Sequence, residues 1–129
     1  GGEALASSQG LRISKRRITS SPDGNTVAIS VMIPESATPS NRLPCVVYCH
    51  GGGMSHYSCF YSNFQTLGRL IAHSGAVVVM VDFRNSETPA LQGEEIGPFP
   101  CGLNDCASAT RWAHANLADL CASHVVMAG

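Results

Sequence analysis

A histidine followed by three glycines is the stretch of this sequence best suited to chemistry. His50, Gly51, Gly52 and Gly53 come directly after a short apolar run, residues 45–49. That order predicts a buried strand whose end turns into a backbone loop without Cβ atoms. Main-chain N–H groups in such a loop can bind the oxygen that becomes negative when an acyl carbonyl is attacked. The pattern therefore indicates an oxyanion hole for acyl transfer.

Composition and charge argue against several other classes of function. The chain has 129 residues, of which 44% are hydrophobic, and its formal net charge is -1. This is the size of a single domain. Beyond Lys15, Arg16 and Arg17 no basic cluster marks a nucleic-acid surface. No apolar run reaches the length of about 20 residues that a membrane helix needs. We therefore expect a cytoplasmic protein with neither nucleic-acid nor membrane partners.

The cysteines predict neither disulfides nor a metal site. The six of them are scattered among strand, loop and helix patterns, whereas a disulfide framework belongs to a small, loop-rich chain. Cys45, Cys49 and His50 carry atoms that suit zinc, but no second cysteine pair stands at ligand spacing. We expect reduced thiols, no metal and no cofactor.

Hydrophobic periodicity predicts an α/β fold. Residues 1–10 are small and polar and are expected to be flexible, so the domain is expected to span residues 11–129. Two alternating segments form a leading antiparallel hairpin, and later apolar runs alternate with helical spacing, which predicts a doubly wound parallel sheet. In chain order, strands are predicted at 11–19, 26–33, 45–50, 76–81 and 124–128, and helices at 60–74 and 101–120.

Several segments together resemble the hormone-sensitive-lipase-like branch of the α/β-hydrolases, over the chain from Leu11 onward. Within that branch, VVVMVDFRN followed by PFPCGLNDC is most similar to the bacterial brefeldin A esterases. The position of the glycine motif between a buried strand and a helix makes the match specific. The segments are His50 with its glycines, then Asp82-Phe83-Arg84-Asn85, then Pro98-Phe99-Pro100 with Asp105, and a last strand that ends in Gly129.

The resemblance implies a carboxylic ester hydrolase that acts on a small-molecule ester. Members of this branch use a Ser nucleophile, a His base and an Asp or Glu, with the Ser in Gly-x-Ser-x-Gly. Gly129 matches the first glycine of that motif. We therefore expect this chain to be the N-terminal half of the domain, with the triad after Gly129 and the C-terminal remainder of the same hydrolase as its partner. Homo-oligomerisation is left open.

The resemblance also assigns roles within the glycine motif. The N–H groups of Gly52 and Gly53 match the donors of the oxyanion hole. Gly51 is expected to shape the turn, and His50 to hold the loop by hydrogen bonds without acting as the base.

Residues that follow the glycine motif are expected to line the acyl or alcohol pocket. These are Met54, His56 and Tyr57, although exposed loop positions suit His56 and Tyr57 equally well. Asp82 and Asp105 are expected to be structural, because the triad acid of this branch lies far downstream. Asp82 would tie its loop by hydrogen bonds. Asp105 would lie in the first turns of a helix, where its negative charge interacts favourably with the positive end of the helix dipole.

Three interpretations of function remain open from the sequence. The first is a carboxylesterase. The second is a hydrolase-like binding protein that has lost its chemistry, because plant gibberellin receptors resemble the same branch. The third is an amidase or peptidase on the same scaffold. The residues after Gly129 would separate the second from the first, and a substrate panel would separate the third.

Overall fold

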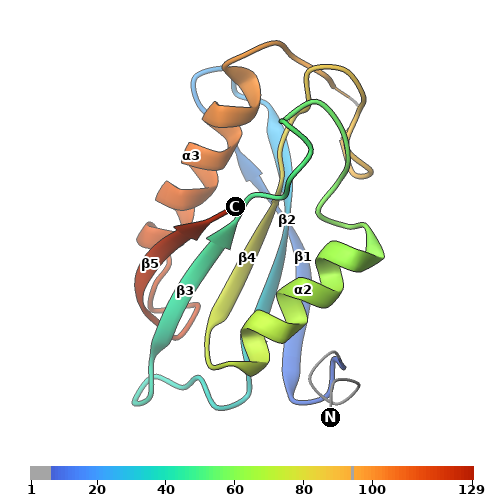
Figure 1. The fold of residues 1–129 in the computed structure, drawn as a ribbon. Helices are drawn as coiled ribbons and strands as arrows, with labels where there is room; N and C mark the ends of the chain where they lie inside the picture. The colour runs from blue at the N-terminus through green and yellow to red at the C-terminus, as the bar shows by residue number, and fades with distance from the viewer. Residues whose placement is uncertain (1–6, 94) are drawn as a thin grey trace.

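The computed structural model describes residues 7–93 and 95–129, which form one mixed sheet with two helices (Figure 1). The strands β1 and β2 are antiparallel, and so are β2 and β4. The pairs β4–β3 and β3–β5 are parallel. The predicted hairpin followed by a parallel α/β sheet is therefore confirmed. Across the sheet the order is β1 (Leu11–Thr19), β2 (Thr26–Pro34), β4 (Val77–Asp82), β3 (Leu43–Tyr48) and β5 (Ala122–Ala128).

The helices α2 (Ser62–His73) and α3 (Cys101–Ala115) cover opposite faces of the sheet. Val78 and Met80 of β4 pack in one cluster with residues of α2. Val79 and Val81 of the same strand pack in another cluster with residues of α3. Successive side chains of a strand point to opposite faces, so β4 is buried along its whole length. This double burial explains why its sequence is continuously apolar.

Several element boundaries differ from the sequence-based prediction. The predicted helix 60–74 is Ser62–His73, and the predicted helix 101–120 ends at Ala115. At its end the C-cap residue Asn116 leaves the helical region of the backbone (φ -116°, ψ 23°), and its side-chain amide donates to the main-chain oxygen of Trp112 (2.8 Å). Such a side-chain cap ends a helix where hydrophobic spacing continues. The predicted strand 45–50 is Leu43–Tyr48, and the last strand begins at Ala122.

Both ends of the described chain differ in their contacts. Residues 1–6 of the segment expected to be flexible lie outside the described residues. The main-chain oxygen of Gly10 accepts a hydrogen bond from the N–H of Glu35 (2.9 Å).

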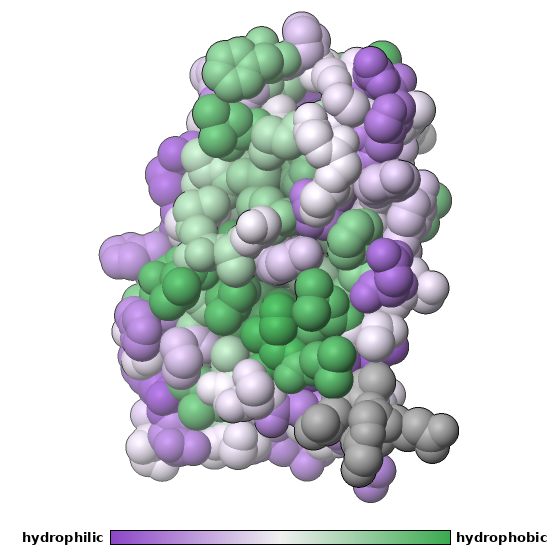
Figure 2. Space-filling view, in the orientation of Figure 1, coloured by the Kyte–Doolittle hydropathy of each residue, from purple (hydrophilic) through white to green (hydrophobic). Residues whose placement is uncertain are grey.

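At the C-terminal end, β5 pairs only with β3 among the described strands. Its Val126 and Met127 are 46% and 55% exposed, and Figure 2 shows apolar side chains gathered around β5, β3 and α2. In the described part of the chain, neither helix has the length and apolarity to cross a bilayer.

Asp105 is the centre of a buried polar network, and it has this structural role in addition to its expected place near the N-terminal end of α3. The carboxylate is fully buried and pairs with the guanidinium of Arg84 (Nη2 to Oδ1, 3.0 Å). It also accepts hydrogen bonds from the hydroxyl of Ser20 (2.7 Å) and the amide of Asn25 (3.2 Å). The first turn of α3 contains no acidic residue. The network joins the turn after β1, the end of β4 and α3.

The hydrogen bonds to Asp105 outweigh its burial. Burial by itself raises the pKa of this carboxyl group, but the bonds from Arg84, Ser20 and Asn25 together hold the pKa below its ordinary value of 3.8. The carboxylate is therefore charged at neutral pH and is matched by the Arg84 guanidinium, which a second carboxylate, that of Asp23, also contacts (3.0 Å).

We expect Asp105→Asn to lower the free energy of unfolding by about 3 kcal/mol, because it leaves the Arg84 guanidinium, whose side chain is only 11% exposed, without its main partner. Urea unfolding of the complete polypeptide at neutral pH measures this. Asp119→Asn removes an exposed carboxylate of the same chain and should change the free energy by less than about 0.5 kcal/mol. Equal losses in the two variants would contradict a network that stabilises the fold.

Candidate active site

The glycine motif and the end of β4 leave the sheet at the same edge. β3 and β4 are parallel neighbours, with Val47 opposite Val79 and Tyr48 opposite Met80. The residues that follow the two strands are therefore close together, although they are about thirty positions apart in sequence. Ligands of open α/β sheets bind at this carboxyl edge of parallel strands.

His50 is buried and holds the start of the glycine loop. It is 4% exposed, and its ring stacks on Phe83 with the centroids 4.3 Å apart and the planes at 15°. Its Nδ1 lies 2.6 Å from the main-chain oxygen of Gly51. A carbonyl oxygen can only accept, so Nδ1 carries the hydrogen. Burial lowers the pKa of His50 below 6.5, and this outweighs the hydrogen bond to Gly51 and the charge of Asp82. The imidazole is therefore neutral at physiological pH.

The loop itself runs through the left-handed region of the backbone. The φ angles of Gly52, Gly53 and Met54 are 119°, 64° and 58°. At Gly52 a Cβ atom would lie 2.7 Å from Cδ2 of Tyr57 and 2.8 Å from the main-chain oxygen of His56. Only glycine fits there, because both the φ angle and the space exclude a side chain. Gly51 has no positive φ and faces open space.

The main-chain N–H groups of Gly52 and Gly53 have no partner within the described part of the chain. Across residues 7–93 and 95–129, neither the N–H of Gly52 nor that of Gly53 donates to another main-chain oxygen or to a side chain. A main-chain N–H group without a protein partner is available to water or to a ligand. The loop can therefore offer two neighbouring donors to an anion.

Two cavities, of about 180 Å³ and 300 Å³, adjoin the glycine loop. Met54 and Leu103 line both of them. Met54 thus lies where a pocket residue was expected. The smaller cavity is lined by Gly53, Met54, Arg84, Ser86, Gly97, Phe99, Gly102 and Leu103, and the larger by Cys49, Met54, Leu103, Cys106, Met127, Ala128 and Gly129.

His56 and Tyr57 line neither of these two cavities. The imidazole of His56 contacts the carboxylate of Glu87 (2.8 Å) and the hydroxyl of Thr88 (3.2 Å). Tyr57 is 49% exposed, and its main-chain oxygen accepts a hydrogen bond from the side chain of Asn85 (2.8 Å). Sequence reasoning assigned no role in the site to Asn85. Its one signal was its place shortly after the C-terminal end of β4, the strand that pairs in parallel with β3.

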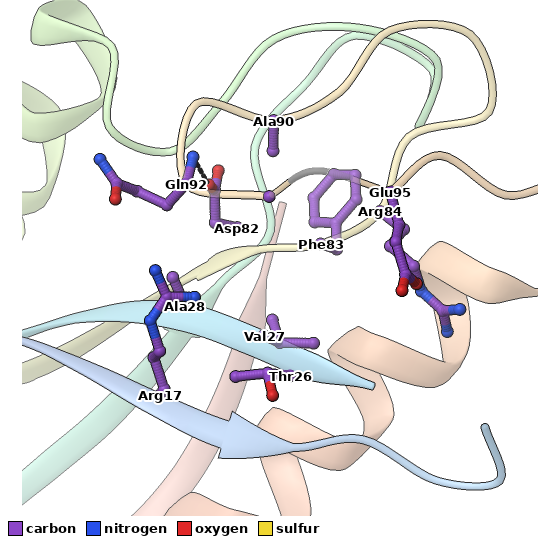
Figure 3. Close-up of a pocket in the computed structure, with 11 residues that line it drawn as sticks. Arg17, Thr26, Val27, Ala28, Asp82, Phe83, Arg84, Ala90, Gln92 and Glu95 are labelled. Atoms are coloured by element: carbon purple, nitrogen blue, oxygen red, sulfur yellow. Dashed lines mark hydrogen bonds between the residues drawn. The ribbon is translucent and has the colours of Figure 1, made fainter. Parts of the chain in front are cut away.

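A further cavity, of about 240 Å³, lies at the same edge beside β1 and β2 (Figure 3). Asp82 contributes to it, and one carboxylate oxygen of Asp82 accepts from the N–H of Gln92 (3.1 Å). The other accepts from Ser58 and from the N–H of Cys59, so Asp82 ties its loops as predicted. Phe83 lines this cavity and also stacks on His50. None of residues 50–54 lines it.

Comparison with known proteins shows the family to which the chain belongs. The model of a family described as "alpha/beta hydrolase fold" matches residues 46–129, which include the glycine loop, both helices and the last strand. The chain belongs to the α/β-hydrolase family. Among the described residues of this hydrolase, no three His, Cys, Asp or Glu side chains converge as metal ligands.

Esterases are among the proteins to which this α/β-hydrolase is similar. The structure of esterase Est22 matches 98% of the chain at 42% identity and a TM-score of 0.90, and the chain covers 37% of it. Brefeldin A esterase, titled a bacterial homologue of human hormone-sensitive lipase, matches 92% at 35% identity and a TM-score of 0.80, with 31% of it covered. These matches confirm the resemblance to the hormone-sensitive-lipase-like branch.

A curated relative gives the same result. Carboxylesterase NlhH of Mycobacterium tuberculosis is 34% identical over 120 residues, which are 85% of this chain and 31% of NlhH. The hydrolase chain therefore spans about a third of the length of the relatives that it matches.

We expect His50 to make the fold sensitive to mild acid. Its pKa is lower in the folded state than the ordinary 6.5, so below pH 6.5 the unfolded chain binds more protons. The free energy of unfolding then falls as the pH drops from 6.5 through the folded-state pKa. Urea unfolding between about pH 7.5 and about pH 5 should show a smaller fall for His50→Gln than for the wild type.

His124→Gln is the control for this experiment, because His124 is exposed on β5. It should keep the wild-type dependence on pH. A wild-type slope in His50→Gln would show that His50 is not the group responsible.

Proposed function

We propose that the polypeptide containing this chain is a serine carboxylesterase, and that this chain supplies the loop of its oxyanion hole. The observation that carries the proposal is that the N–H groups of Gly52 and Gly53 have no partner within residues 7–93 and 95–129. They stand at the carboxyl end of a buried strand and beside an apolar cavity that Gly53 itself lines. Membership of the α/β-hydrolase family and similarity to esterases support it.

In the proposed mechanism, the two N–H groups donate to the carbonyl oxygen of the ester as it becomes an oxyanion. Each such donor typically contributes about 2.7–4 kcal/mol to transition-state stabilisation. The donors are held in place before the substrate arrives, because the imidazole of His50 donates a hydrogen bond to the main-chain oxygen of Gly51 at the start of the loop. The proposed reaction calls for no metal or cofactor.

The nucleophile of the proposed reaction would follow Gly129. The N–H of Cys49 donates to the main-chain oxygen of Ala128 (3.0 Å), so β3 and β5 stay paired to their ends. A Cβ atom built on Gly129 would lie 2.6 Å from the main-chain oxygen of Cys49. A residue placed after Gly129 would therefore leave the sheet next to the glycine loop. This proximity favours a Ser at an elbow there, with the acid and base further along the chain.

The proposed substrate is a small-molecule ester with a small or medium acyl group. The two cavities beside Met54 have volumes of about 180 Å³ and 300 Å³ and are lined largely by apolar side chains and glycines. Such a lining would take the hydrocarbon part of an ester while the glycine loop takes its carbonyl oxygen.

We expect the complete polypeptide to hydrolyse short-chain p-nitrophenyl esters faster than the matching p-nitroanilides, because the donors serve the oxyanion of either substrate while the ester has the better leaving group. Release of p-nitrophenol and p-nitroaniline measures this by absorbance. Ester binding without turnover would replace the proposal with a hydrolase-like binding protein. Faster cleavage of the anilide would replace it with an amidase.

We expect Gly52→Ala to lower kcat for the ester about 100- to 1000-fold, the usual cost of losing an oxyanion donor. The new methyl group would collide with Tyr57 and His56, so the loop must move. Gly75→Ala is the matched control, because Gly75 has a φ of 109° and a Cβ atom there would meet no other atom within 4 Å. It carries a similar backbone strain away from the loop and should keep kcat within about twofold. Equal kcat losses would show that strain alone accounts for the effect.

A further inference from the structure

A fully buried asparagine links the end of β4 to the glycine loop. Asn85 follows Arg84 directly and has no exposed surface. Its side-chain Nδ2 donates to the main-chain oxygen of Tyr57 at 2.8 Å. Its own main-chain oxygen accepts from the N–H of Gly97 (2.9 Å). Asn85 is therefore held from one side and holds the loop on the other.

The residues after Asn85 bind the same loop through its carbonyl groups. The N–H of Ser86 donates to the oxygen of Met54 (2.9 Å), and the N–H of Thr88 donates to the oxygen of Ser55 (3.1 Å). In Figure 1 the two segments run side by side beyond the ends of β3 and β4. The carbonyl groups of residues 54, 55 and 57 thus accept bonds from residues 85–88, whereas the N–H groups of Gly52 and Gly53 have no protein partner among the residues that the structure describes. Binding a loop by its acceptors fixes its position and leaves its donors free.

Tyr57 transmits the contact of Asn85 to the glycines. Its φ of 79° is unusual for a residue other than glycine, so the bond to its carbonyl group helps to hold a conformation that it would otherwise leave. The space that a Cβ of Gly52 would occupy lies 2.7 Å from the ring of Tyr57. A change at the carbonyl group of Tyr57 therefore moves the atoms that pack against Gly52.

The side-chain oxygen of Asn85, Oδ1, makes no hydrogen bond among the described residues that would offset its burial. Burying an unpaired acceptor is unfavourable, and an apolar side chain of similar size would avoid it. The amide is thus explained by its donor, which points at Tyr57, and not by a satisfied local network.

We propose that Asn85 is a positioning residue for the oxyanion hole, acting through the carbonyl group of Tyr57 on the placement of Gly52 and Gly53. The proposal rests on the esterase function proposed above. Asn85 would thus help to stabilise the transition state without contacting the substrate.

The first test measures kinetics in the complete polypeptide. Asn85→Leu removes both the donor and the unpartnered oxygen, and Asn85→Asp turns the donor into a second acceptor facing the oxygen of Tyr57. Both variants should lower kcat for a p-nitrophenyl ester about tenfold or more and change KM less than about threefold, since an oxyanion donor acts mainly in the transition state. Asn85→Leu should keep the Tm within about 4 °C of the wild type. A wild-type kcat in a folded Asn85→Leu variant would overturn the proposal.

Asn116 provides the matched control. Its Nδ2 also donates to a main-chain oxygen at 2.8 Å, that of Trp112. It lies at the C-terminal end of α3, about 22 Å along the helix from its N-terminal end beside the site. Asn116→Leu should keep the wild-type kcat. If kcat fell by a similar factor in both leucine variants, the effect of Asn85→Leu would be a general loss of structure, and the positioning role would be rejected.

A second measurement does not depend on turnover. Amide hydrogen exchange of a peptide covering residues 85–88 should become at least tenfold faster in Asn85→Leu, and not in Asn116→Leu, because the N–H groups of Ser86 and Thr88 are those bonded to the loop. Unchanged exchange would overturn the positioning role. Faster exchange in a protein whose wild type hydrolyses no ester would support the positioning role and overturn the esterase function instead.

Discussion

The parallel pairing of β3 with β4 is the constraint on which the candidate site depends. It makes both strands end at one edge of the sheet, so the residues after β4 lie against the residues after β3. The stack of Phe83 on His50 and the bond from Ser86 to Met54 are consequences of this pairing. An antiparallel arrangement of the same strands would send the two loops to opposite edges, and the glycine loop would lose the segment that supports it.

Two buried carboxylates restrain that supporting segment on either side. Asp82 ends β4 and binds the N–H of Cys59 and of Gln92. Asp105, on α3, binds the guanidinium and the N–H of Arg84. The short stretch between Asp82 and Arg84 is thus anchored to loops and to a helix that are remote in sequence. A rigid support of this kind matters for an oxyanion hole, because its donors stabilise a transition state only if they need no rearrangement.

The glycine loop combines local strain with free donors. Residues 52, 53, 54 and 57 have positive φ angles, and the carbonyl groups of residues 54, 55 and 57 accept hydrogen bonds from residues 85–88, while the N–H groups of Gly52 and Gly53 donate to no protein group among the described residues. Such a conformation is unfavourable for Met54 and Tyr57 and persists only because the surrounding contacts hold it. The protein thereby gives up some stability for an arrangement of donors that is ready before a ligand binds.

The sequence by itself determined the α/β class, the succession of strands and helices along the chain and the place of the glycine loop, because alternation, continuous apolar runs and glycine at the end of a strand are local patterns. The order of the strands across the sheet came from the tertiary structure. It also gave the likeness to esterases of the α/β-hydrolase family, which the comparisons confirm. Only the tertiary structure decided that Asp105 is buried against Arg84, that His56 turns toward Glu87, and where α3 ends. The bond between Ser20 and Asp105 joins residues 85 positions apart, and that between Asn85 and Tyr57 joins residues 28 apart. No local pattern encodes such contacts, since they arise when the sheet brings separate segments to one edge.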